Sequence, residues 1–283
     1  MMGVIPETYG FALAGIGLHF LVLARGMQSP PPSSAMTVAS LIVNAGVTVT
    51  NAVLNLISSV VMAWGRMPVR KWLRIELRIW LKAGIGLAVL VLPLAYYFAP
   101  TLVSNAAAAP KLVWWIININ RGEPASFLDV VTAFFLYAHV APVFTIVNLP
   151  TPDLHPMLDF RLFRYGLSGA AALALWGATI LTGVYFMLRD KALRRLLLIV
   201  LAWMAVNIVL HWYWQYRGSV YLYGAHSAFA LFVVLVVGYA KALQTLPATL
   251  TRSLMLCMIA LTAWNNLGLY KEMITFLIAQ PPG

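Results

Sequence analysis

The chain has 283 residues, of which 62% are hydrophobic and only 10% are charged, and its mean hydropathy is +0.85. A soluble domain cannot hide so much apolar surface, so the composition predicts a polytopic helical membrane protein. The net charge of +11 does not indicate nucleic-acid binding, because the positive residues gather in short segments between apolar runs, as in the cytoplasmic loops of membrane proteins. The single cysteine, Cys257, lies in an apolar run, which argues against a disulfide framework and a thiolate metal site.

The first predicted membrane helix covers residues 9–24, with no signal-peptide cleavage site after it. The next apolar run, residues 35–64, is too long for one perpendicular crossing of about 20 residues. Its middle is polar, which favours two short helices that meet near Thr50–Asn51, with polar side chains satisfying the freed backbone groups. In a single tilted helix the same polar residues would still share an inward face. They are Asn44, Thr48, Asn51 and Asn55.

A basic stripe follows, with cations at four-residue spacing: Arg66, Arg70, Arg74, Arg78 and Lys82. Glu76 is the only acid among them, and apolar residues supply the other face. This pattern predicts an amphipathic helix on the cytoplasmic leaflet, which serves as a topology determinant or docks a lipid phosphate.

Residues 83–99 are expected to span outward, and 104–124 to form a linker and an interfacial loop. Because the basic segments 66–82 and 189–195 should both be cytoplasmic, an even number of spans must separate them. Residues 83–99 and 167–188 supply two. We therefore expect residues 127–149 to be a re-entrant or surface helix on the outer side.

The later helices are expected at 167–188, 196–210, 228–240 and 254–279. The first carries small residues at every fourth position, which predicts a close-packing ridge: Gly166, Ala170, Ala174, Ala178 and Thr182. No soluble linker is evident, so residues 1–283 are expected to form one integral membrane domain. The predicted fold is all-α, a transmembrane bundle of about eight membrane helices with amphipathic or re-entrant surface helices.

The aromatic turn between His211 and His226 is the strongest candidate site. Its rings are typical of a membrane interface, and a snorkelling arginine would complete an ordinary aromatic belt. Arg217 between two histidines also suits an anionic headgroup or phosphate. The predicted substrate-binding residues are Arg217, His211, His226, Tyr221 and Tyr223. The spacing of the histidines does not predict a metal site.

Three short segments resemble bacterial multi-spanning proteins of the GT-C glycosyltransferase type: Pro6–Ala12, Gly46–Asn51 and Tyr221–His226. The resemblance implies transfer of a sugar from a polyprenyl-phosphate carrier at the outer face of the bacterial inner membrane, often with a divalent metal ion. It also implies an acidic base in an early outer loop, upstream of a segment like Pro6–Ala12. No residue here matches that base, and Glu7 is only the nearest acid by position.

Three functions remain open at this stage. The first is a GT-C-like glycosyltransferase or its carrier-binding portion, in contact with membrane lipids and a lipid-linked sugar. The second is a transporter or flippase whose substrate site is the polar segment 44–55. The third is a non-catalytic membrane partner. No catalytic residue is assigned.

Overall fold

The computed structural model describes residues 5–27, 33–47, 49–104, 125–147, 157–160, 164–214, 224 and 228–279. The chain divides into two compact units, and each is described by itself. The first unit comprises Met1–Ile119 with Leu201–Trp203, and the second comprises Asn120–Val200 with Met204–Gly283. The expectation of one integral membrane domain stays a prediction.

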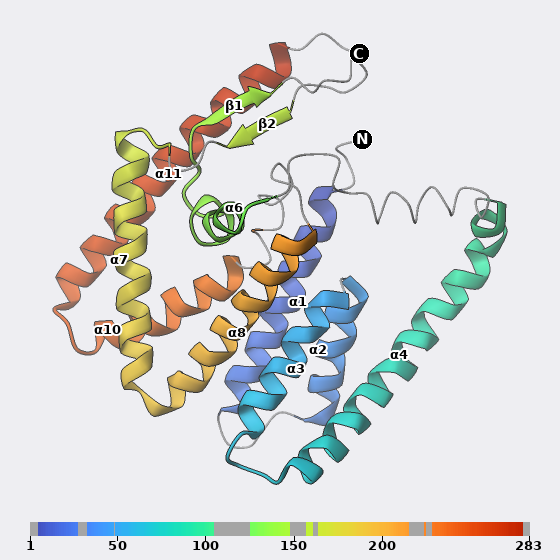
Figure 1. The fold of residues 1–283 in the computed structure, drawn as a ribbon. Helices are drawn as coiled ribbons and strands as arrows, with labels where there is room; N and C mark the ends of the chain where they lie inside the picture. The colour runs from blue at the N-terminus through green and yellow to red at the C-terminus, as the bar shows by residue number, and fades with distance from the viewer. Residues whose placement is uncertain are drawn as a thin grey trace. The chain divides into compact units, whose positions relative to one another are not determined.

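The first unit is built from four helices: α1 Ile5–Gly26, α2 Ser34–Val47, α3 Val49–Ala63 and α4 Val69–Ser104. The helices α1, α2 and α3 lie side by side (Figure 1). Ser33 caps α2, because its hydroxyl accepts a hydrogen bond from the Met36 backbone N–H at 3.3 Å. The predicted division of residues 35–64 into two short helices is confirmed, with the helix ends at Val47 and Val49 instead of Thr50–Asn51.

The pair α2–α3 is an antiparallel hairpin, since Asn55 contacts both Asn44 and Ser40. With 14 and 15 residues, the two helices are only about 21 and 22 Å long. The hydrocarbon core of a bilayer is about 30 Å thick. Neither helix is therefore long enough to cross a membrane alone.

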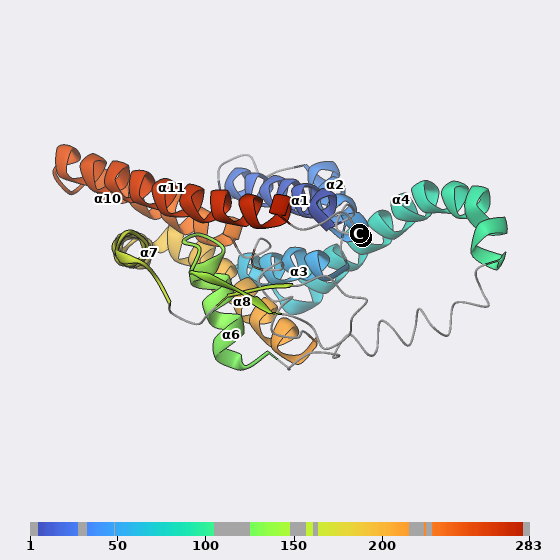
Figure 2. The same cartoon turned by 90° about the horizontal axis from the view of Figure 1, so that it is seen from above.

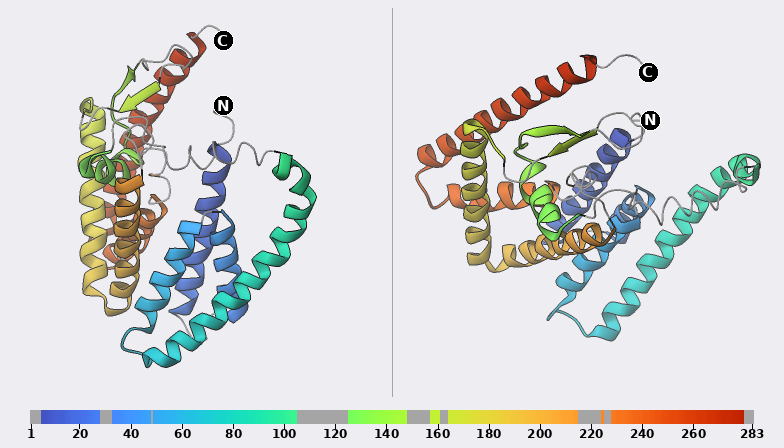
Figure 3. Two further views of the ribbon diagram at one scale, coloured as in Figure 1. Left: turned by 45° about the vertical axis from the view of Figure 1, so that its right-hand side comes forward. Right: turned by 45° about the horizontal axis from the view of Figure 1, so that its top comes forward.

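The basic stripe and the predicted outward span belong to one continuous helix, α4, of 36 residues. The expectation of a surface helix separate from the span is therefore wrong. The turn before α4 contains Gly65, whose φ of 68° is a conformation that favours glycine. One face of α4 is directed toward the neighbouring helices and carries, at helical spacing, Trp72, Glu76, Trp80 and Ala83. Its basic side chains are exposed. Figure 3 shows the first half of α4 beside α2, while its second half runs away from the other helices of this unit.

The second unit is mostly helical and includes one small antiparallel sheet. Its elements are α6 Phe127–Thr132, the π-helix η2 Ala133–Tyr137, β1 Phe144–Val147, β2 Met157–Phe160, α7 Leu167–Arg189, α8 Lys191–Trp214, the π-helix η3 Val234–Gly238, α10 Tyr239–Leu243 and α11 Ala248–Ala279. In the sheet, Phe144 lies opposite Phe160. Apart from this strand pair, the described elements are helical, as predicted.

The helix α7 packs against α11, which crosses it, and against η3 and α10 (Figure 2). The predicted small-residue ridge is wrong, since Gly166, Ala170, Ala174 and Ala178 are exposed. The buried face of the helix is a different one and includes Gly169, Ala172, Trp176, Thr179 and Gly183. Both faces carry small residues, so spacing alone does not identify the face that receives the neighbouring helices.

Three helices in the described residues are long and apolar enough to cross a membrane: Leu167–Arg189, Lys191–Tyr213 and Ala248–Phe276. They support a membrane protein, whereas a count of about eight spans is not supported. Residues 127–137 form only two short helical segments before β1. These segments are too short to cross, in agreement with the prediction for 127–149, while the side on which they lie stays a prediction.

Candidate functional site

Of the five predicted substrate-binding residues, only His211 lies in the described part of the chain. Arg217, Tyr221, Tyr223 and His226 lie outside the described residues. The His211 side chain is buried, and its ring meets Phe134 edge to face at a centroid distance of 5.3 Å. This histidine therefore packs in the protein interior within the second unit.

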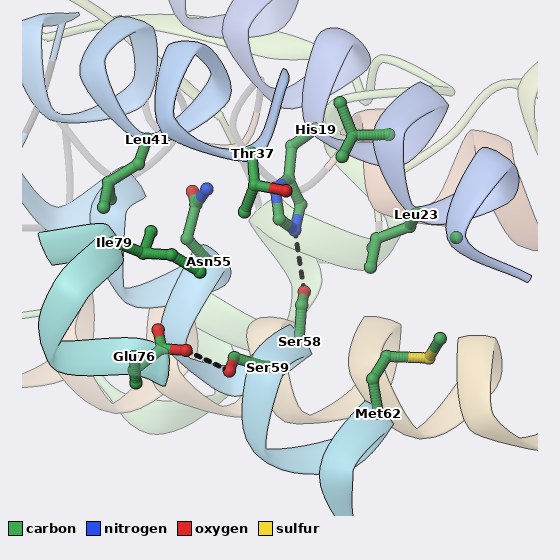
Figure 4. A pocket seen from close by; sticks show the side chains of 12 residues that line it. His19, Leu23, Thr37, Leu41, Asn55, Ser58, Ser59, Met62, Glu76 and Ile79 are labelled. Carbon is green, nitrogen blue, oxygen red and sulfur yellow. Dashed lines mark hydrogen bonds between the residues drawn. The ribbon is translucent and has the colours of Figure 1, made fainter. Parts of the chain in front are cut away.

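The first unit holds a different constellation, a partly open cavity of about 230 Å³ lined by residues of α1, α2, α3 and α4. Figure 4 shows the side chains that line it. Half of the lining residues are apolar or glycine, and six carry polar or charged groups that sequence reasoning did not bring together. These six are His19, Thr37, Asn55, Ser58, Ser59 and Glu76.

His19 links the helices that surround the cavity. Its Nδ1 lies 3.1 Å from the Ser40 hydroxyl and its Nε2 lies 2.8 Å from the Ser58 hydroxyl. Asn55 Nδ2 donates to the same Ser40 oxygen at 3.4 Å. If Ser40 accepts from Asn55 and donates to Nδ1, the imidazole proton belongs on Nε2, which then donates to Ser58. The Ser58 hydroxyl keeps its own proton for a partner in the cavity.

The polar face of α2 and α3 points inward, as predicted. Asn44, Asn51 and Asn55 are all buried, whereas Thr48 lies outside the described residues. Their amides do not satisfy freed backbone groups as expected, because Asn44 Nδ2 donates to Asn55 Oδ1 at 2.8 Å. Neither side-chain polar atom of Asn51 has a hydrogen-bond partner within the described residues. The hairpin therefore buries more hydrogen-bond donors and acceptors than it pairs within the described residues.

Glu76 brings a carboxylate to the cavity from α4, where its side chain points toward Ser59 (Figure 4). Glu76 is 8% exposed. Oε1 accepts from Trp80 Nε1 at 2.8 Å, and Oε2 accepts from the Ser59 hydroxyl. Ser59 in turn accepts from Trp72 Nε1 at 2.8 Å. Among the described residues, Glu76 forms no ion pair, so its hydrogen bonds come from neutral donors.

Sequence reasoning missed Glu76 because it treated this acid as part of the basic stripe. The signal was present in the spacing. Trp72 and Trp80 lie four residues before and after Glu76, which places all three on one face of a helix. The basic residues occupy the opposite, exposed face.

The second unit uses half-buried polar side chains to support backbone. The irregular segment after η2 is held by α11, since Asn266 Nδ2 donates to the His139 carbonyl at 2.8 Å and Asn266 Oδ1 accepts from the Ala141 N–H at 3.0 Å. Asn265 Nδ2 donates to the Ala141 carbonyl at 2.9 Å. The His139 ring stacks on Trp176 at 4.1 Å between centroids. These contacts fix the segment in place.

A metal centre is not evident in the described ranges, which contain no group of three His, Cys, Asp or Glu residues placed to hold an ion. The divalent metal implied by the GT-C resemblance stays a prediction, as does the resemblance itself. No protein-family model, curated protein or solved structure matches the chain.

Proposed function

We propose that the chain is an integral membrane protein that binds a small polar solute in the α1–α4 cavity and carries it across the membrane. The observation that supports this proposal most strongly is the convergence of buried polar groups from three different helices on one cavity. Buried polar and ionisable groups are expensive in an apolar bundle, and they mark substrate pathways by default. His19, Ser58 and Glu76 come from α1, α3 and α4 respectively.

The short α2–α3 hairpin supports the same function. Transporters commonly place their substrate sites where membrane helices are interrupted, because the interrupted helices leave polar groups near mid-membrane. Here α2 ends at Val47 and α3 begins at Val49, and the hairpin supplies Asn55, Ser58 and Ser59 to the cavity. The volume of about 230 Å³ is below the range of about 300–1,000 Å³ that is usual for drug-sized ligands. The solute is therefore small.

Accessibility of the cavity from the two sides of the membrane tests the proposal. In a Cys257→Ser background, which removes the exposed native thiol, a Ser58→Cys variant is treated with a membrane-impermeant thiol reagent in right-side-out and inside-out vesicles. A carrier alternates, so labelling is expected in both preparations.

Leu54→Cys is the matched control, since Leu54 is buried in α3 and does not line the cavity. It should label slowly in both preparations. Labelling of Ser58→Cys from one side only would contradict alternating access and would favour an enzyme or a non-catalytic membrane partner.

The GT-C glycosyltransferase is the second candidate. It is favoured by one placement: Pro6–Ala12 lies on α1 and Gly46–Asn51 spans the α2–α3 junction, so two of the three resembling segments belong to the four-helix unit that holds the cavity. In this function Arg217 contacts the carrier phosphate at the outer face of the inner membrane. The test is release of labelled sugar from a polyprenyl-phosphate donor by the purified protein.

A further inference from the structure

We propose that the cavity takes a small protonated amine, with the Glu76 carboxylate as its counter-charge. This inference rests on the proposed solute-binding function and names the class of solute. The negative charge of Glu76 is not balanced by a positive charge among the described residues. Glu76 is buried and lines the cavity, yet within the described residues it forms no ion pair. A buried carboxylate is costly unless a positive charge compensates it.

The neighbouring hydrogen bonds hold the carboxylate without neutralising it. Trp80 and Ser59 each donate to one oxygen of Glu76, and a carboxylate oxygen has lone pairs for a second donor. The indole and hydroxyl donors carry no net charge. They orient the carboxylate, so an arriving cation meets a fixed acceptor with unused capacity.

The cations of α4 are not placed to complete an ion pair. Arg74 and Arg78 lie two residues before and after Glu76, and both are exposed. Residues two apart on a helix do not face each other. Among the described residues, Glu76 is the one charged residue of the cavity lining, so a compensating charge has to come through the cavity.

The lining favours an organic cation over a metal ion. Hard metal ions are bound by six or more oxygen ligands in close geometry, whereas Leu23, Leu41 and Ile79 occupy much of this wall. Apolar side chains with a few well-placed polar groups are typical of sites for small organic molecules. An alkylammonium ion matches both the carboxylate and the apolar wall of the cavity. Its charged end meets Glu76, and its hydrocarbon part meets the aliphatic side chains.

The experiment measures binding of ethylamine and butylamine to the full chain in lipid nanodiscs by isothermal titration, at a pH where the amines are protonated. Propan-1-ol and pentan-1-ol serve as neutral ligands of similar length. Saturable binding of the amines at least about tenfold tighter than that of the alcohols is expected, which corresponds to a difference of about 1.4 kcal/mol. Glu76→Gln removes the charge but keeps an acceptor for Trp80, and it should abolish this preference.

Glu272→Gln is the matched control, because it removes an exposed carboxylate from α11 and should leave amine binding unchanged. Ile79→Phe gives a second measurement if Glu76→Gln folds poorly. It narrows the cavity and keeps the carboxylate, so butylamine should lose more affinity than ethylamine.

The outcomes separate this inference from the proposed function. If amines and alcohols bind equally well and Ile79→Phe weakens both, the cavity binds solutes but the amine class is wrong. If neither class binds, the solute-binding function fails together with the inference. Amine binding that persists in Glu76→Gln, or that Ile79→Phe leaves unaltered, would overturn the assignment to this cavity.

Discussion

The contact between Gly238 of η3 and Gly183 of α7 gives the sharpest test of the packing. A Cβ atom built on Gly238 would lie 2.4 Å from both the Cα and the carbonyl oxygen of Gly183, and 2.6 Å from its carbonyl carbon. These are backbone atoms, which cannot rotate away as a side chain does. The substitution Gly238→Ala therefore forces the two helical segments apart.

Two opposing effects set the magnitude of the change. Overpacking a tight interior costs about 1–3 kcal/mol, and a clash with backbone belongs at the upper end of this range. Replacing glycine by alanine in a helix returns about 1 kcal/mol. The expected net loss in the free energy of unfolding is about 2 kcal/mol, or a fall in Tm of roughly 4–8 °C for a chain of this size.

The assay is thermal unfolding of the purified protein in one detergent, followed by loss of the monodisperse peak in size-exclusion chromatography. Gly177→Ala is the matched control, because it lies on α7 and a Cβ atom there meets no atom within 4 Å. Its Tm should stay equal or rise by a few degrees. Equal Tm values for Gly238→Ala and Gly177→Ala would refute the close contact between α7 and η3.

Three further predictions concern single residues. The pKa of Asp190 is held below its usual 3.8 by the backbone N–H of Leu193, the Lys241 ammonium 3.2 Å away and the backbone N–H of Ala192. The ionised carboxylate therefore stabilises the fold above about pH 3.8, and this stabilisation is lost as the pH falls through the lower pKa of the folded state. The Tm should consequently fall less steeply on acidification in Asp190→Asn than in the wild type. Asn266→Ala leaves the Ala141 N–H and the His139 carbonyl without their partner. The free energy of unfolding, measured by chemical denaturation, should fall by about 2–4 kcal/mol. A change smaller than the error of the measurement would contradict these bonds. Arg217→Lys should lose most binding of carrier lipid at normal accumulation if the GT-C proposal holds, and a silent Arg217→Lys together with a functional Arg217→Ala would remove this arginine from the site.

The sequence predicted the helix interruption and the inward polar face because both follow from local chemistry. Asn44, Asn51 and Asn55 are too polar for a lipid-facing surface, and their spacing places them on one face. Burial in an interior is then their only stable position. The structure confirms this position, although the amide of Asn44 bonds to that of Asn55 and not to backbone.

The remaining features depend on contacts between distant residues. Nothing local between Lys82 and Ala83 ends a helix, yet the change from basic to apolar composition suggested a boundary, and α4 continues through it. The pairing of Phe144 with Phe160 joins residues that only the fold brings together. Glu76 became a candidate only when α1, α2 and α3 supplied the other walls of its cavity.

Transport of a charged solute through the α1–α4 cavity can be measured as an electrical current. Proteoliposomes that contain the full chain are adsorbed on a sensor membrane, and the current is recorded when ethylamine is applied at constant pH and ionic strength. If the cavity carries a protonated amine, we expect a transient current that saturates with ethylamine concentration, persists in Glu272→Gln and disappears in Glu76→Gln. A current no larger than that of protein-free liposomes, or an undiminished current in Glu76→Gln, would contradict it.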